Sequence, residues 1–196
     1  MRKMLTGVLL VCVFSVFFAG GQAVLVPATE VSVDEYPNSG FAIYARIDGV
    51  DGECTEENHV GWIVIDSLMF GVHVPEGGAT GQSRRRASVI AEDLELVKEI
   101  DKSSPKIADA VCKGKTYPIV EIEVTMPSTE GSRVFVGYEL KNVVLKSYLH
   151  HADIFEDDCP WDVFTMSYEE ITMTYTEYDD EGNEKGDTEW TYVNQE

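Results

Sequence analysis

Residues 94–115 read LELVKEIDKSSPKIADAVCKGK, and they contain the best-marked helix of the chain. Ser104 is the predicted N-cap, Pro105 takes the first helical position, and Gly114 marks the C-terminal stop. The apolar face of this helix consists of Ile107, Ala108 and Val111. The preceding residues 87–101 are ambiguous, because intrinsic propensity favours a helix while the alternation of the leucines also fits a strand.

Most of the remaining chain shows the period-two alternation of β-strands. Strands are predicted over 41–47, 118–126, 133–147, 164–175 and 188–193. The alternation changes phase at Lys141–Asn142 and again at Glu169–Glu170, which predicts two β-bulges. Residues 62–70 are almost wholly apolar, as expected for a strand covered on both faces. The pattern therefore predicts a strongly curved sheet or barrel with one helix.

The chain is acidic and long enough for one domain. It has 196 residues, 44% of them hydrophobic, with 35 Asp and Glu against 15 Lys and Arg, a formal net charge of −20. Nucleic acid is excluded as a main partner, because phosphate binding needs a basic face. The charge is uneven, since residues 98–115 carry five Lys against three acidic residues, whereas residues 177–189 carry seven acidic residues against one Lys. A basic and an acidic end suit a head-to-tail contact between copies.

The N-terminus is typical of a secretory signal peptide. Arg2 and Lys3 precede an apolar run over 5–19, and Gly21-Gln22-Ala23 places small residues where a signal peptidase cleaves. The alternative is an uncleaved membrane anchor, because residues 4–29 carry no charge.

The expected organisation is a signal peptide at 1–23, a linker at 24–40 and a folded domain at 41–196. Cleavage after Ala23 would make the protein secreted, either extracellular or periplasmic, without stable membrane association. One disulfide is expected at most, with the pair left open, because the mature chain keeps three cysteines: Cys54, Cys112 and Cys159.

The stretch 94–115 resembles the Hcp family, the haemolysin-coregulated tube proteins of bacterial type VI secretion. The family shows a strand ending in K-x-x-D-x-x-S/T-P, then a helix, then G-K/H. These places are taken here by Lys98, Asp101, Ser104, Pro105, Gly114 and Lys115. Further similarities follow in order over 41–196: Ile47-Asp48-Gly49 with Gly52-Glu53, His59 with Trp62 and Ile65-Asp66, Met166 to Tyr175, and Trp190 with Asn194.

The resemblance implies an antiparallel two-sheet β-barrel with one α-helix, similar to a phage tail tube. It also implies that residues 87–100 are mainly strand. Family members form hexameric rings that stack into a hollow tube, which carries a spike protein and small effectors, and they are not enzymes. The loop at 75–86 corresponds to a family loop that reaches the neighbouring ring. Its basic run gives three candidate ring contacts: Arg84, Arg85 and Arg86.

Candidate catalytic and metal-binding motifs are weak. His150, His151 and Asp153 precede the acidic run 156–158, but no ligand spacing defines a site, and a solvated acidic loop is the simpler interpretation. Residues 177–188 have the length of a calcium loop, but Thr188 stands where a bidentate Glu is required. Ser-His-Asp catalysis lacks the G-x-S-x-G elbow. We therefore expect no catalytic residue, metal or cofactor, with a metal-dependent hydrolase as a minor alternative.

The leading hypothesis is a structural tube component of a type VI secretion apparatus. The alternative is a Sec-exported Hcp-like binding module that does not form a tube. The signal peptide favours this alternative, because a Sec-exported copy could not enter a cytoplasmic tube.

Overall fold

The computed structural model describes residues 40–74, 89–128, 131–154, 159–179 and 181–194, and a short strand pair near the N-terminus. The chain divides into two units, Met1–Ser39 and Gly40–Glu196. In the first unit, β1 (Phe18–Ala19) pairs antiparallel with β2 (Gln22–Ala23). Most of the predicted signal peptide and linker lies outside the described residues, so both remain predictions. No helix in the described ranges has the length and apolar character needed to cross a bilayer.

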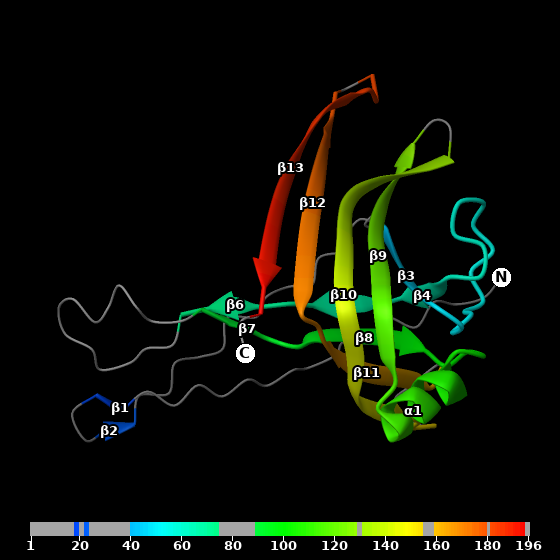
Figure 1. Cartoon of the computed structure of the whole chain (residues 1–196), viewed down its shortest axis with the longest axis vertical. Helices are drawn as coiled ribbons and strands as arrows, with labels where there is room; N and C mark the ends of the chain where they lie inside the picture. Colours follow the sequence, from blue (N-terminus) through cyan, green and yellow to red (C-terminus); the bar gives the residue numbers. More distant parts are fainter. Residues whose placement is uncertain are drawn as a thin grey trace. The chain divides into compact units, whose positions relative to one another are not determined.

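In its described residues, the second unit consists mainly of strands, with one helix between β8 and β9 (Figure 1). Its elements are β3 (Ala42–Ile47), β4 (Ile63–Ile65), β5 (Ser67–Met69), β6 (Val72–His73), β7 (Ile90–Ala91), β8 (Leu94–Glu99), α1 (Ser104–Lys113), β9 (Thr116–Ser128), β10 (Gly131–His151), β11 (Trp161–Ser167), β12 (Glu170–Tyr178) and β13 (Glu184–Val193).

The main sheet has nine antiparallel strands and folds back over itself. Its hydrogen-bonded path runs β4-β3-β9-β10-β11-β8-β5, and β12 and β13 branch from β10. Only Asp66 separates β4 from β5 in the sequence. The first and last strands of the hydrogen-bonded path are therefore neighbours along the chain. In Figure 1, β8 and β11 accordingly cross the long strands β9 and β10. The predicted mainly β, antiparallel fold with one helix is confirmed; nine strands pair as one branched sheet, and β6 pairs with β7 in a separate two-stranded sheet.

The branch in the sheet lies at Asn142 of β10. The strand pairs with β12 over 136–141 and with β11 over 144–151. At the branch, Asn142 has a φ of 51°, and its Nδ2 donates to Glu169 Oε2 at 2.6 Å. Asn tolerates this left-handed conformation better than most residues. The side chain of Asn142 thereby ties the branch point to the turn between β11 and β12.

The two predicted bulges take a different form in the structure. The register between β10 and β9 continues unbroken past Lys141–Asn142, and it shifts instead between Val134 and Val136. The second phase change, at Glu169–Glu170, is the break between β11 and β12. The changes in the alternation of apolar residues therefore coincide with the branch of the sheet. They do not mark β-bulges between β9 and β10.

The core lies between the long strands and the crossing strands β8 and β11. Alternation correctly predicts the inward side chains of Val120 and Ile122 in β9, which are fully buried, but it fails farther along the strand, where Thr125 is 2% exposed and Val124 is only partly buried. The crossing strands contribute four apolar residues of 0% exposure: Leu94, Leu96, Phe164 and Met166. Burying an aliphatic or aromatic side chain of this size contributes about 1.5–3 kcal/mol.

The structure resolves the ambiguity of residues 87–101 and corrects the prediction of a single strand over residues 62–70. Residues 90–99 form β7 and β8, so the helical propensity of 87–101 was misleading and the strand implied by the family resemblance is correct. Pairing with β11 and burial of alternate side chains outweigh local propensity here. The apolar stretch 62–70 is not one doubly covered strand but the two strands β4 and β5, with Val64 and Met69 44% and 62% exposed.

Helix α1 packs onto the sheet through Ile107 and Ala110, which are 0% and 2% exposed. Its N-cap is Ser103, not the predicted Ser104, whose side chain turns into the core. Pro105 lies in the first turn, one place later than predicted because the helix begins at Ser104, and Gly114 is the predicted C-cap at φ 59°. A left-handed C-cap of this kind favours glycine because a Cβ atom would be strained there.

Candidate functional site

A buried polar cluster joins α1 to β8 and β11. Lys98 and Asp162 are cross-strand neighbours with fully buried side chains, and Lys98 Nζ lies 3.3 Å from Asp162 Oδ2. The same Nζ is 2.8 Å from Asp101 Oδ1 and donates to Ser104 Oγ at 3.0 Å. A buried charge is strongly destabilising unless it is paired and hydrogen-bonded. The K-x-x-D-x-x-S motif therefore supplies the partners that allow Lys98 to be buried.

Asp162 has three further polar neighbours in the cluster. The Ser104 hydroxyl donates to Oδ2, the Tyr148 hydroxyl donates to Oδ1 at 2.9 Å, and His150 Nδ1 lies 2.9 Å from Oδ1. Burial would raise the pKa of Asp162, but hydrogen bonds from Ser104, His150 and Tyr148, with the charge of Lys98, outweigh it and lower the pKa. Burial and the bond to Asp162 raise the pKa of Tyr148 to about 12. The cluster thus holds an ionised carboxylate and a neutral phenol at neutral pH.

The cluster brings together Ser104, His150 and Asp162, the residue types of a hydrolytic triad, but in the wrong order. In a triad the histidine lies between the serine and the acid and takes the serine proton. Here the acid lies between the other two, and the Ser104 hydroxyl accepts from Lys98 and from the Asp101 N–H while it donates to Asp162. Ser104 is also 2% exposed. This geometry anchors α1 and does not activate a nucleophile.

The residues with metal-ligand side chains do not converge. His150 faces Asp162, whereas the ring of His151 packs against Trp161 with centroids 4.7 Å apart. Asp153 follows the end of β10, and residues 156–158 lie outside the described ranges. In the described part of the chain, no three His, Cys, Asp or Glu side chains are grouped as a metal ion requires.

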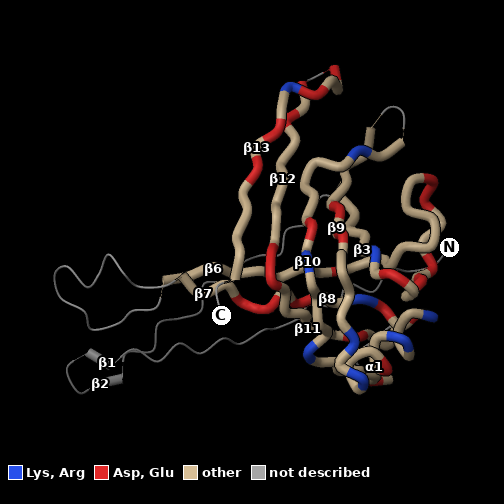
Figure 2. The backbone as a smooth tube through the Cα atoms, viewed as in Figure 1, with Lys and Arg blue, Asp and Glu red and all other residues tan. Residues whose placement is uncertain are grey.

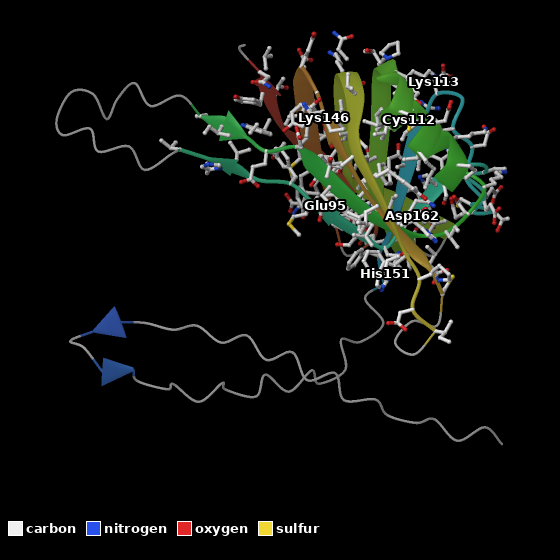
Figure 3. All side chains as sticks on the ribbon, turned by 90° about the horizontal axis from the view of Figure 1, so that it is seen from below. Glu95, Cys112, Lys113, Lys146, His151 and Asp162 are labelled. Carbon is white, nitrogen blue, oxygen red and sulfur yellow. The ribbon has the colours of Figure 1, made fainter. Side chains whose placement is uncertain are left out.

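The three cysteines of the second unit are free thiols. Cys54 is buried, Cys112 is exposed on α1 beside Lys113, and Cys159 is half-buried (Figure 3). No disulfide joins any two of these three residues. The structure therefore does not contain the single disulfide that the sequence allowed among them.

The apolar face of the sheet continues beyond the core. On β10 and β12, Leu140 lies opposite Ile171, and both are 0% exposed. The same face continues toward the tip of the β12–β13 hairpin with five residues, here called the apolar sheet end: Val136, Tyr138, Met173, Tyr175 and Trp190. Figure 1 shows β12 and β13 extending past β8 and β11, which cover the core.

The apolar sheet end is only partly covered within the subunit. Trp190 packs at an angle against Phe70 with centroids 6.0 Å apart, yet it remains 40% exposed. Tyr175, farther along, is 46% exposed. Grouped apolar and aromatic side chains at a protein surface mark interaction sites. This surface is therefore a candidate contact for another protein chain.

Figure 2 shows several basic residues around α1, and acidic residues spread over the second unit, including the β12–β13 hairpin. Basic residues surround α1: Lys102, Lys106, Lys113 and Lys115. Lys106 and Lys113 are paired with Asp51 and Asp109, so only part of this basic charge is free. The β12–β13 hairpin carries mainly acidic residues, and its one lysine, Lys185, is paired with Glu177. The predicted contacts Arg84, Arg85 and Arg86 lie outside the described residues.

Sequence reasoning singled out Lys98 and Ser104 but missed Asp162 and Tyr148. The signal for Asp162 was present, because it shares the inward phase of Phe164 and Met166 in β11. An acid in an apolar phase predicts a buried partner, and Lys98 shares the phase of Leu94 and Leu96 in the same way. Only the pairing of β8 with β11 shows that these two charges meet.

Comparisons with known proteins agree with this architecture. The family model of the type VI secretion system effector Hcp matches residues 44–175. A solved type six secretion system protein is 25% identical with a TM-score of 0.69, and the match covers 78% of this chain and 95% of that one. Hcp1 from Salmonella typhimurium is 18% identical with a TM-score of 0.63, covering 79% and 95%. A type VI secretion system effector from Yersinia pestis is 17% identical with a TM-score of 0.61, covering 77% and 98%. The comparison with curated proteins gives no match.

Proposed function

Because the chain belongs to the Hcp family of type VI secretion proteins, we propose that it is a structural tube component that forms stacked hexameric rings and carries effectors. Its partners in this proposal are further copies of itself, a spike protein and small effectors. The proposal gives the chain no catalytic activity and no cofactor. The enclosed hydroxyl of Ser104, donating to a carboxylate, agrees with this assignment.

The observation that supports ring formation is the apolar sheet end. Tyr175 and Trp190 lie on the same face as the fully buried Ile171, yet they are 46% and 40% exposed. Among the described strands, β13 is hydrogen-bonded to β12 alone, so its other edge is open. An open strand edge beside exposed aromatic side chains favours a lateral contact with a second subunit.

Stacking of rings is supported by the uneven charge. Lysines that are only partly paired lie around α1, and the β12–β13 hairpin is acidic. The basic region of one ring could therefore attract the acidic hairpin of the next, in a head-to-tail contact that repeats along the stack. We assign Arg84, Arg85 and Arg86 to the same contact, as a basic loop that meets acidic surface on the next ring. This assignment rests on the sequence, where they form the only basic run of the domain.

A second candidate function rests on the N-terminal sequence. Residues 1–23 have the layout of a cleavable signal peptide, and a chain exported through Sec would reach the periplasm or the medium without entering a cytoplasmic tube. In that case the protein acts as an exported Hcp-like binding module, either as a monomer or as a single ring.

Electron microscopy of the purified protein tests the proposal. Wild type should form stacked rings, whereas the double variant Tyr175→Ser, Trp190→Ser should form far fewer. Thr174→Ser, on the opposite face of β12, is the matched control and should behave as wild type. Circular dichroism must show that the double variant is folded. Wild-type particles that are single rings or monomers would favour the exported module.

A further inference from the structure

His59 is a buried histidine that lies outside the apolar sheet end. It belongs to the irregular loop 51–62 between β3 and β4, and it is 1% exposed. Its Nδ1 lies 2.6 Å from Glu56 Oε2, and its Nε2 lies 2.7 Å from Glu123 Oε2 on β9. One imidazole ring thus joins a carboxylate of its own loop to a carboxylate of the sheet.

The chemistry of these groups determines where the protons must be. An ionised carboxylate only accepts hydrogen bonds, so each ring nitrogen must donate. A neutral imidazole has one N–H, and only the imidazolium of His59 can make both bonds. Two bonds from one ring to two ionised carboxylates therefore require an imidazolium, and such charge-assisted bonds are about twice as strong as neutral ones.

The groups around the ring favour this arrangement. Tyr44 of β3 stacks on the His59 ring with centroids 4.2 Å apart, and Trp62 meets it edge-on at 4.9 Å. Burial, with Cys54 and Glu56 nearby, raises the pKa of Tyr44, so its phenol stays neutral. Arg46 of β3 lies over the outer face of Trp62 and pairs with Glu121 of β9.

The same contact reaches β10. Glu56 Oε1 accepts a hydrogen bond from Ser132 Oγ at 2.9 Å, near the turn between β9 and β10. The hydrogen bond from His59 lowers the pKa of Glu56, against its partial burial. Loop 51–62 is therefore held to three strands, through Tyr44 on β3, Glu123 on β9 and Ser132 on β10.

We propose that Glu56, His59 and Glu123 form a protonation-dependent latch that fastens loop 51–62 to the outer face of β3 and β9. The latch is closed when both carboxylates are ionised and the imidazole is protonated. Loss of any one of these three charges weakens the contact and releases the loop. Release frees the loop from Ser132 and exposes Tyr44, which is 9% exposed when the latch is closed.

Opening the latch changes a surface that a ligand or partner would meet. An open groove of about 580 Å³ borders the loop, lined in part by Arg46, Val60 and Trp62. Because Val60 and Trp62 belong to the latched loop, its release reshapes the groove. The latch is a property of the folded subunit and does not depend on ring formation.

Nitrogen NMR of the full-length protein tests the protonation state directly. At pH 7 both ring nitrogens of His59 should show the chemical shifts of a protonated imidazolium. The signal is assigned by its loss in His59→Gln, and the other three histidines serve as internal references. A neutral tautomer of His59 at pH 7 would overturn the proposal.

Hydrogen exchange then tests whether the charges hold the loop. Glu123→Gln keeps the shape of the side chain but removes its charge, and protection factors of amides in 51–62 should fall roughly tenfold at pH 7. Glu170→Gln is the matched control, because it removes the charge of a similarly exposed carboxylate that pairs with Lys141 away from the loop, and it should leave the protection of the loop as in wild type. Equal protection in wild type and Glu123→Gln at pH 7 contradicts the latch.

Discussion

Lys98 Nζ lies 3.3 Å from Asp162 Oδ2, on neighbouring strands whose two side chains are closed to solvent. Ser104, at the start of α1, hydrogen-bonds to both of these side chains. Burying the charge of Lys98 or of Asp162 alone would be strongly unfavourable. The ion pair and the two hydrogen bonds of Ser104 compensate for this cost. This relationship explains the fixed spacing between Lys98 at the end of β8 and Ser104 at the start of α1.

The first prediction concerns the loss of this ion pair. Lys98→Met leaves Asp162 buried without its cation, so the free energy of unfolding should fall by about 3–5 kcal/mol. Urea denaturation measures the change. Lys113→Ala removes an exposed pair with Asp109, and it should change the free energy of unfolding by less than about 1 kcal/mol. Lys98→Met with Asp162→Leu should recover part of the loss, and equal stability of Lys98→Met and wild type would refute this role.

The second prediction concerns stability in acid. Asp162 has a lowered pKa in the folded state, so its carboxylate contributes stability that is fully present above the unfolded-state pKa of about 3.9. This contribution is lost as the pH falls through the lower, folded-state pKa. The free energy of unfolding of wild type should therefore fall more steeply below about pH 4 than that of Asp162→Asn. Parallel pH profiles of the two proteins, measured by urea denaturation, would show that Asp162 does not control acid stability.

The third prediction concerns the basic run at 84–86. Changing Arg84, Arg85 and Arg86 together to Glu should leave the domain folded, because loop residues contribute little to the core. Stacking of rings should weaken, since three favourable charges become three unfavourable ones. Light scattering measures the extent of stacking, with a triple Lys variant as the charge-preserving control. Stacking of the Glu variant at the wild-type level would place the contact elsewhere.

The fourth prediction concerns processing. The positive residues Arg2 and Lys3, the apolar run and Gly21-Gln22-Ala23 predict cleavage after Ala23. N-terminal sequencing of the exported protein should therefore begin at Val24. Recovery of the chain in the membrane fraction with Met1 intact would identify an anchor instead.

Local signals in the sequence were sufficient for much of the fold. Proline and glycine at 105 and 114 define α1 because they act on the backbone itself, and alternation at Val120 and Ile122 defines a half-buried strand. Local propensity failed at Leu94 and Leu96, whose strand conformation depends on pairing with β11. Phase changes showed where the sheet departs from regularity but could not distinguish a bulge from a branch.

The candidate surface was harder to predict than the fold. Ile171 and Tyr175 share one phase of the same strand, and nothing local shows that the first is buried and the second is 46% exposed. The difference arises because β8 and β11 cross one part of the sheet and leave the other part uncovered. Which neighbours His59 meets likewise depends on how loop 51–62 folds back onto β9.

The solution mass of the purified mature protein tests the central claim most directly. Analytical ultracentrifugation at about 0.15 M salt, where exposed charges more than about 8 Å apart are largely screened, limits repulsion between the acidic subunits. A ring-forming tube protein should sediment as six subunits or as multiples of six. A species with the mass of one subunit at micromolar concentration would contradict the proposed assembly.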